Sequence, residues 1–503
     1  MGIPSYYKRL YDSNPHLVQK RVSNAGADIL LFDFNCLIYH CVRGSRMPVY
    51  SVETKNAWET ALFQEIKRYV LNIWEVAGKP REVFLAVDGA VPMAKIRQQR
   101  LRRFKSVWLA GKEVEAGVRV GGWDTNQITP GTEFMEKLTR ELQTVCKTRG
   151  WTVSGAEEPG EGEQKLMEWL RRRGDLAGSS VCVYGLDADL IVLSLLHLSG
   201  VSCKSWKLLR EAAEFGMGKA EGDAFSTFDV KLLLGIVCES AAVVADRRGD
   251  FMMDYVCGMS LLGNDFLPHS LSVKIKEGGY DRFFAALKGC GRLVVDGKVQ
   301  YRGILQLVQA WAAEEEGQIH EGFREKYSGR GPPCRTDADR LMLETNKLPL
   351  VWSEESCMWS AGLGFVPEWR DIYYSKWMRG SDMDAICREY CVGLQWIMDY
   401  YTGKPVSYQW YFPWSLPPLW ADLAVRLTAP VMPVATAPLK PQEQLALVLP
   451  LESWDYVRDA GLRDLPQRFP AFWPRRFGFF SAGRKLLWEC EPEIPVLTVG
   501  RFR

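Results

Sequence analysis

The chain has 503 residues, of which 47% are hydrophobic and 25% are charged. This is the composition of a folded globular protein, and it excludes a chain that is disordered throughout. The length allows about three domain-sized units, or one large catalytic core with elaborations. The 63 basic and 61 acidic residues nearly cancel, so a charged binding surface requires local segregation of the two signs.

The sequence gives no indication of a zinc protein, a secreted protein or a membrane-spanning protein. The 13 cysteines include no CxxC pair and the five histidines are scattered, so no zinc site is indicated and the cysteines are expected to be free thiols. No window reaches the roughly 18 apolar residues of a membrane span, and the first residues, MGIPSYYKRL, lack the apolar core of a signal peptide. We expect a cytoplasmic protein that does not enter the membrane, with the nucleus or an organelle as the open alternatives.

Short aliphatic runs alternate with longer amphipathic segments in the first 290 residues. The runs at 29–34, 82–88 and 181–185 predict buried strands, and the segment ETALFQEIKRYVLNIWEV, which starts at Glu59, predicts a helix between two of them. Strand, crossover helix and strand in this order predict an α/β fold with a mainly parallel sheet.

The remaining chain predicts three units. We expect a first domain over 1–290, a linker or helical segment over 291–336 and a helical, aromatic-rich region with a short C-terminal unit over 337–503. The second boundary rests on the Gly/Pro-rich stretch SGRGPPCRT at 328–336.

Acidic residues follow the predicted strands. Asp33 and Asp88 end two of them, and Asp187 and Asp189 follow the third in the sequence GLDADL. Ligands of open parallel sheets bind at the carboxyl ends of the strands, so these side chains are predicted to converge. Residues two apart in an extended segment point the same way, so Asp187 and Asp189 are expected to share one ligand.

Three further acids extend this set. Glu161 and Glu163 form a second spaced pair in the Gly-rich sequence PGEGEQK, and Asp265 follows the apolar run of LLGNDFLPH. A single Asp after a strand is often only a turn former or a cap. Seven carboxylates in one place would repel each other unless cations lay among them, and hard divalent ions such as Mg²⁺ or Mn²⁺ prefer oxygen ligands. Two such ions could support the cleavage of a phosphodiester bond.

A basic segment begins seven residues after Asp88. The sequence KIRQQRLRRFK at 95–105 contains six basic residues and no acid. On a helix, one face would present Lys95, Gln99, Arg102 and Arg103. A run of charges is more often a solvated helix face, but next to an acidic cluster these donors would suit a terminal phosphate group.

The motifs resemble those of the XRN family of 5′→3′ exoribonucleases. The resemblance is carried by MGIPSYYKRL, LFDFNCLIYHC, AVDGAVPMAKIRQQRLRRFKS, ITPGTEFMEKL, SGAEEPGEGEQKLMEWLR, VYGLDADLIVLSL and DYVCGMSLLGNDFLPH in the first conserved region. Segments 393–414, 440–450 and 472–480 resemble the second conserved region. The resemblance covers essentially the whole chain and implies a compact catalytic core.

The resemblance has implications for fold, chemistry and site. It implies a PIN/flap-nuclease-like mixed sheet between helices, with the second region wrapped around the active site. It implies stepwise hydrolysis of single-stranded RNA from a 5′-monophosphate end, with release of nucleoside 5′-monophosphates, in RNA decay or processing, with two Mg²⁺ or Mn²⁺ ions and with protein adaptors as conceivable partners. The family's metal-binding and catalytic acids fall on Asp33, Asp88, Glu161, Glu163, Asp187, Asp189 and Asp265, and its 5′-phosphate pocket falls on Lys95, Gln99, Arg102 and Arg103.

The chain departs from the family at the residues that stack on the terminal base. Tyr39 stands where the family has a histidine, and Trp410 is the expected aromatic partner in the run YQWYF. Tyrosine can still stack on a base. Trp396, Tyr400 and Tyr411 are interpreted as core residues, because aromatic residues near helical spacing more often pack than bind.

Two other functions are open on the sequence. One is a structure-specific flap-type DNA nuclease, although no Gly-rich helix-hairpin-helix run for gripping duplex DNA is found. The other is an RNA-binding scaffold that retains the XRN fold with weak or no turnover. The intact set of seven acids opposes it.

Overall fold

A computed structural model describes residues 2–115, 117, 122–185, 187–212, 224–328, 337–380 and 382–502. The Gly/Pro-rich stretch expected as a domain boundary lies outside the described residues from position 329 to 336. All cysteines in the described ranges are free thiols, as predicted. No helix in these ranges is long and apolar enough to cross a membrane.

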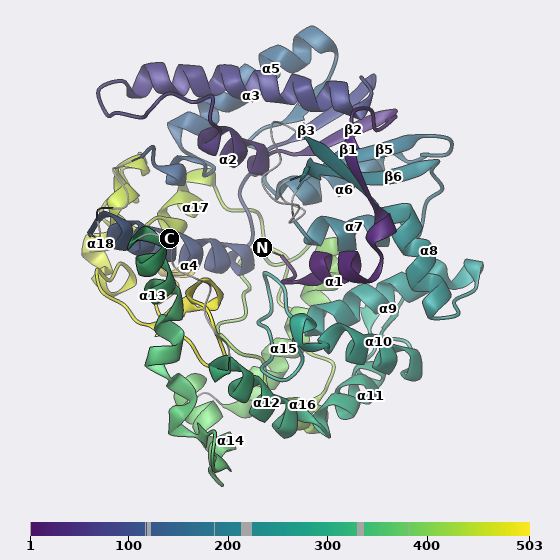
Figure 1. The fold of residues 1–503 in the computed structure, drawn as a ribbon, viewed down its shortest axis with the longest axis vertical. Coiled ribbons are helices and arrows are strands. Elements are labelled where there is room, and N and C mark those ends of the chain that lie inside the picture. Colours follow the sequence, from purple (N-terminus) through teal and green to yellow (C-terminus); the bar gives the residue numbers. More distant parts are fainter. Residues whose placement is uncertain are drawn as a thin grey trace.

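A seven-stranded sheet forms the centre of the first half of the chain (Figure 1). Its order is β1(Val18–Val22), β7(Phe225–Asp229), β6(Ser205–Glu211), β5(Ser180–Tyr184), β2(Ile29–Asp33), β3(Glu82–Ala86) and β4(Thr152–Ser154). The strands β6, β5, β2, β3 and β4 are parallel, and β7 is antiparallel to β6 and β1. The predicted α/β fold with a mixed, mainly parallel sheet is confirmed, and so are the three predicted strands.

The two faces of the sheet are covered by different helices (Figure 1). On one face, Leu30 and Phe32 of β2 pack with α2(Asn35–Arg43), α3(Lys55–Ala77) and α5(Glu133–Arg149). On the other face, Ile29 and Leu31 pack with α6(Gly162–Arg173) and α7(Asp189–Leu198). The strand is apolar at both odd and even positions because both of its faces are buried.

The later helices extend the core on the α7 side. They are α8(Val230–Ser240), α9(Arg248–Leu261), α10(Gly279–Gly289), α11(Tyr301–Ala312), α12(Glu315–Tyr327), α15(Met383–Tyr401) and α16(Trp420–Arg426). The helix α13(Asp337–Trp352) lies apart from this core, and its Trp352 stacks on Phe479 with ring centres 5.6 Å apart. One hydrophobic core contains Leu193, Leu307 and Trp396, which come from the three units predicted from the sequence. The boundaries at 290 and 336 stay a prediction.

The C-terminal segment holds the basic helix in place. The basic segment lies in α4(Met93–Glu115), and the apolar side of α4 packs against α17(Pro441–Val448) and the chain that follows it. Arg100 is fully buried there, where its Nη1 donates to Leu447 O at 2.7 Å and its Nε donates to Pro495 O at 3.2 Å. Because α4 is anchored in this way, its Lys95, Gln99, Arg102 and Arg103 side chains are held at the wall of a cavity.

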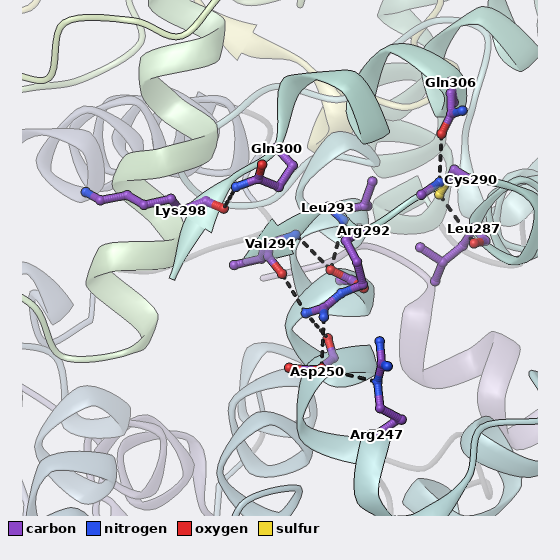
Figure 2. A network of polar contacts seen from close by, with 12 residues as sticks. Arg247, Asp250, Leu287, Cys290, Arg292, Leu293, Val294, Lys298, Gln300 and Gln306 are labelled. Atoms are coloured by element: carbon purple, nitrogen blue, oxygen red, sulfur yellow. Dashed lines mark hydrogen bonds and ion pairs between the residues drawn. The ribbon is translucent and has the colours of Figure 1, made fainter. Parts of the chain in front are cut away.

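A polar network fixes α9, the helix that leads to Asp265 (Figure 2). Asp254 Oδ1 accepts hydrogen bonds from the backbone N–H groups of Leu293 and Val294, and its Oδ2 accepts from Arg292 Nε at 2.6 Å. Arg292 also forms an ion pair with Asp250 at 2.9 Å. These contacts tie α9 to the hairpin of β8(Val294–Val295) and β9(Lys298–Val299).

Candidate active site

The carboxyl ends of three parallel strands bring the first acids together. Asp33 is the last residue of β2, Asp88 lies two residues beyond β3 and Asp187 lies three residues beyond β5. Because β2 pairs in parallel with both β3 and β5, the three strands end at the same edge of the sheet. The sequence predicted this convergence.

The other four acids are not at strand ends. Glu161 directly precedes α6 and Glu163 lies in its first turn, Asp189 begins α7, and Asp265 follows the end of α9. The expected extended geometry of Asp187 and Asp189 is wrong, since Ala188 between them has helical angles of φ −69° and ψ −21°. Three of these acids therefore lie where a helix begins, and a helix N-terminus favours a negative charge.

One cavity of about 930 Å³ contains most of the predicted site. The residues that line it include Asp33, Asp88, Glu161, Glu163, Asp187, Asp265, Lys95, Gln99, Arg102, Arg103 and Tyr39. Asp189 is 1% exposed and lies behind this lining, where its side chain is next to Gly2. The structure thus brings the acidic residues, the basic face of α4 and Tyr39 together at a single site.

The ammonium group of Lys95 lies between two of the acids. It forms an ion pair with Glu161 and another with Asp265, the latter at 2.7 Å. Lys95 therefore contacts the acidic part of the cavity, whereas the sequence assigned it to the phosphate pocket. Tyr400, from α15, donates a further hydrogen bond to Glu161 Oε1 at 3.0 Å.

Three of the other acids, Asp33, Glu163 and Asp189, are poorly compensated. Burial raises the pKa of Asp33 well above its usual range, and the charges of Asp88 and Asp187 add to this increase. Burial likewise raises the pKa of Glu163, with Glu161 adding to it, and that of Asp189, with Asp265 adding to it. The Oδ1 atom of Asp189 is buried and has no hydrogen-bond partner among the described residues. Such a cluster is stabilised by additional cations.

The oxygen atoms of the seven acids are therefore the kind of metal ligands that hard cations prefer. All the donors are carboxylate oxygens, which Mg²⁺ and Mn²⁺ prefer, and Asp189 Oδ1 is a buried acceptor without a donor. In the described part of the chain, however, no group of three or more His, Cys, Asp or Glu side chains has the geometry of a metal site. The single positive charge of Lys95 is shared between Glu161 and Asp265, so it offsets only part of their negative charge.

Gly162 allows the acidic loops to approach each other. Its N–H donates to Asp88 Oδ1 at 2.7 Å, and a Cβ atom at this position would lie 2.5 Å from Asp33 Oδ1 and 3.0 Å from Ala86 O. Any side chain at position 162 would displace Asp33, so glycine is required by the close contact of the loop with β2 and β3.

The polar side chains on the basic face of α4 differ in how many of their hydrogen-bond donors already have protein partners. Arg103 donates to Asn126 Oδ1 at 2.9 Å and to Ile128 O at 3.4 Å, and burial lowers its pKa to about 10, so that it stays charged at neutral pH. Gln99 accepts a hydrogen bond from Gln444 Nε2 at 3.3 Å. The guanidinium of Arg102 has no polar partner among the described residues, which leaves its donors available to a ligand.

The two residues expected to stack on a base are in different surroundings. Tyr39 lines the cavity, and the guanidinium of Arg43 lies 5.8 Å from the centre of its ring. Trp410 is 8% exposed, packs at 5.2 Å against Trp396 and donates from Nε1 to Glu389 at 2.9 Å. Trp410 is not among the residues that line the cavity. Stacking by either residue stays a prediction.

Sequence reasoning missed two contributors to this site. Tyr400 was interpreted as a core residue, and it is buried, but its hydroxyl group contacts Glu161. Arg210, near the end of β6, also lines the cavity. Neither has a motif signal, because Tyr400 becomes a neighbour of Glu161 only when α15 packs across a chain separation of 239 residues.

Two segments of the chain match models of known protein families. The family model of the XRN 5′-3′ exonuclease N-terminus matches residues 1–212, and that of the Xrn1 helical domain matches residues 363–501. The chain is 30% identical to 5′-3′ exoribonuclease 1 of Saccharomyces cerevisiae over 342 residues, which cover 61% of this chain and 22% of that protein.

Two further relatives match along the whole chain. Identity is 27% to 5′-3′ exoribonuclease 1 of Homo sapiens, with 100% of this chain and 34% of that protein covered. It is 24% to 5′-3′ exoribonuclease 2 of Arabidopsis thaliana, with 100% of this chain and 66% of that protein covered. The chain thus spans between about a fifth and two thirds of the length of these three relatives.

Proposed function

Because the chain belongs to the XRN family, whose two conserved regions it matches in order, we propose that it is a 5′→3′ exoribonuclease. Its substrate would be single-stranded RNA with a 5′-monophosphate, and its products nucleoside 5′-monophosphates. The observation that supports this most directly is the shared cavity, which combines acids at the sheet edge with the basic face of α4.

The basic face would bind the 5′-phosphate. The guanidinium of Arg102 has no polar partner among the residues that the structure describes, and Arg103 and Gln99 are held in place by hydrogen bonds with Asn126 and Gln444. Two guanidinium groups match the charge of one terminal monophosphate and offer bidentate contacts. Tyr39, in the same cavity, would stack on the first base.

We also propose that the acids bind two divalent ions, Mg²⁺ or Mn²⁺. The residues that would hold them are Asp33, Asp88, Glu161, Glu163, Asp187, Asp189 and Asp265. When bound, such ions supply Lewis-acid stabilisation of phosphodiester hydrolysis. Around them, Lys95 would position Glu161 and Asp265 through its ion pairs, and Tyr400 would orient Glu161 through its hydrogen bond.

The test uses RNA labelled at its 3′ end that carries a 5′-monophosphate, 5′-hydroxyl or 5′-triphosphate, each with Mg²⁺ or with EDTA. The proposal expects decay of the monophosphate RNA alone, release of mononucleotides and dependence on the metal. Asp187→Ala is the matched inactive variant, since it removes one acid from the cavity.

Other outcomes would favour the alternatives. Tight RNA binding without decay in Mg²⁺ would support a scaffold role in RNA metabolism, and cleavage inside a flapped DNA would support a structure-specific nuclease. A cytoplasmic site of action in RNA decay, with or without adaptor proteins, stays a prediction that localisation of the tagged chain would check.

A further inference from the structure

A second cavity, of about 320 Å³, lies on the other side of Arg102. Arg102 and Asp265 line both this cavity and the active-site cavity. Four segments form its wall, namely the residues after the N-terminus, one side of α4, the loop after α9 and the segment 483–492. Its volume is at the lower end of the range for small-molecule sites, so it suits one nucleotide better than an oligonucleotide.

The acids of this cavity are already paired with cations. Asp265 pairs with Lys95 at 2.7 Å, Glu489 pairs with Lys276 at 2.6 Å and Glu491 pairs with Arg97 at 3.1 Å. Within the described ranges, these contacts leave some cations of the lining without an acidic partner.

Three basic side chains form this cationic surplus. Arg102 and Arg484 have no ion-pair or hydrogen-bond partner for their guanidinium groups in the described part of the chain. Lys105 donates only to two neutral carbonyl groups, Trp488 O and Cys490 O, both at 2.8 Å. A cavity lined by three cations that have no ion-pair partner among the described residues attracts an anion with more than one negative charge.

The neighbouring titratable groups are affected by the same positive charge. Burial lowers the pKa of His269 to about 4, and Arg484 contributes to the decrease. Burial also lowers the pKa of Lys105 and that of Lys274, and Arg484 adds to both decreases. The positive potential around Arg484 is therefore present at three different side chains of the cavity.

Two features suit the nucleoside part of a ligand. The side chain of Trp488 is 58% exposed at the cavity and offers a flat apolar surface on which a base could stack. Gln98 also lines the cavity, and its Oε1 atom is buried without a donor among the described residues. A ribose hydroxyl or a base amino group would supply that donor.

We propose that this cavity binds a nucleoside 5′-monophosphate, which is the product of the proposed exoribonuclease, after it leaves the active-site cavity past Arg102. The proposal rests on the proposed function for the source of the ligand, but the site itself is defined by Arg484, Lys105 and Trp488, which do not line the active-site cavity. Product release is a common rate-limiting step, so a nearby site for the product would speed turnover.

The first test is equilibrium dialysis with radiolabelled AMP in EDTA. The wild-type chain should bind two AMP molecules, one at the proposed 5′-phosphate pocket and one at the second cavity. Arg484→Gln should weaken only the second site, by about tenfold or more, because it removes a charged donor. Trp488→Ala should weaken the same site several-fold. Arg475→Gln, at an exposed arginine outside the cavity, is the matched control and should bind like the wild type.

AMP binding that is unchanged in stoichiometry and affinity in both Arg484→Gln and Trp488→Ala would overturn the proposal, whether the wild type binds one AMP or two. Inorganic phosphate serves as the second probe, and displacement of the second AMP by phosphate at equal concentration would show an anion site without nucleotide recognition, which also overturns it.

The second test separates this proposal from the proposed function. In Arg484→Gln the ratio of steady-state to single-turnover cleavage rate should fall several-fold, and an unchanged ratio would overturn the role in product release. If the wild-type chain degrades no 5′-monophosphate RNA, the proposed function fails, while the dialysis result still decides whether the cavity binds the nucleotide.

Discussion

The ammonium of Lys95 donates a hydrogen bond to Asp265 Oδ2 at 2.7 Å, although the two residues are 170 positions apart in the chain. The same ammonium is paired with Glu161, and the side chain of Lys95 is only 11% exposed. Lys95 thus joins the basic helix to the acidic cluster and neutralises part of it.

Replacement of this lysine should destabilise the protein when no divalent ion is present. Removing one partner of a buried ion pair costs ~3–5 kcal/mol, so Lys95→Met should lower the melting temperature in EDTA by several degrees. Mg²⁺ or Mn²⁺ should restore part of the loss, because the freed carboxylates could then bind a cation. Differential scanning calorimetry with and without metal measures this.

The matched control is Lys67→Met. Lys67 pairs with Glu141 at 2.8 Å on the surface, with side chains 24% and 44% exposed, and exposed pairs contribute only about 0–1 kcal/mol. Equal melting temperatures of Lys95→Met and the wild type in EDTA would contradict the role of Lys95 as the internal counter-charge.

Arg102→Ala should remove the selectivity for the 5′ end. Arg102 has donors free of protein partners in the described residues, so the variant should bring the ratio of cleavage rates on 5′-monophosphate and 5′-hydroxyl RNA close to one. Arg475→Ala, at an exposed position, should leave this ratio at its wild-type value. A persistent preference in Arg102→Ala would remove this residue from the proposed phosphate pocket.

Gly162→Ala should abolish most of the activity through the position of Asp33. The added Cβ would lie 2.5 Å from Asp33 Oδ1, so the carboxylate must move, and misplacement by about 1 Å can cost ~100-fold in rate. Single-turnover cleavage of 5′-monophosphate RNA is the measurement. Gly235→Ala, inside α8, is the control, since a Cβ there meets no atom within 4 Å and alanine favours the helix by roughly 1 kcal/mol. Near-normal cleavage by Gly162→Ala would show that this contact is not required.

Tyr400→Phe tests the contact between the two conserved regions. The lost hydroxyl group donates to Glu161 Oε1 at 3.0 Å, and a hydrogen bond to a charged group contributes ~1.5–3 kcal/mol. The cleavage rate should fall about tenfold or more, with a higher metal concentration needed for half activity. Tyr390→Phe is the matched control, because the hydroxyl group of Tyr390 is buried with no hydrogen-bond partner among the described residues. Equal rates for the two variants would make Tyr400 a packing residue only.

Glu315 should make stability depend on pH away from the active site. Burial raises its pKa to about 7, although the N–H groups of Trp420 and Ala421 donate to its carboxylate and lower it. A carboxyl group with a raised folded pKa stabilises the fold below its unfolded pKa, and this contribution is lost as the pH rises through the folded value. The loss should therefore occur between about pH 4.5 and pH 7.

Glu315→Gln removes this titration. Relative to the wild type, the variant should gain stability from pH 5 to pH 8, by up to about 3 kcal/mol for a shift of this size. Melting temperatures of the two proteins across this range measure the difference. Parallel curves would show that Glu315 does not titrate there.

Local sequence patterns were enough to predict the central strands of the sheet and much of the candidate site. Apolar runs that end in Asp33 and Asp88 predict buried parallel strands, whose carboxyl ends must meet at one edge, and the spacing of Lys95, Gln99, Arg102 and Arg103 alone puts them on one helix face. These features depend on local periodicity, which is independent of the rest of the fold.

Tertiary structure decided the contacts between distant segments. Asp265 and Tyr400 reach Lys95 and Glu161 only because α9 and α15 pack against the sheet domain, and no local pattern encodes that docking. The position of Trp410 was decided in the same way: packing against Trp396 and a hydrogen bond to Glu389 place its indole in the core, apart from the cavity. Aromatic residues near helical spacing serve core and binding sites alike, so only their neighbours in space distinguish the two roles.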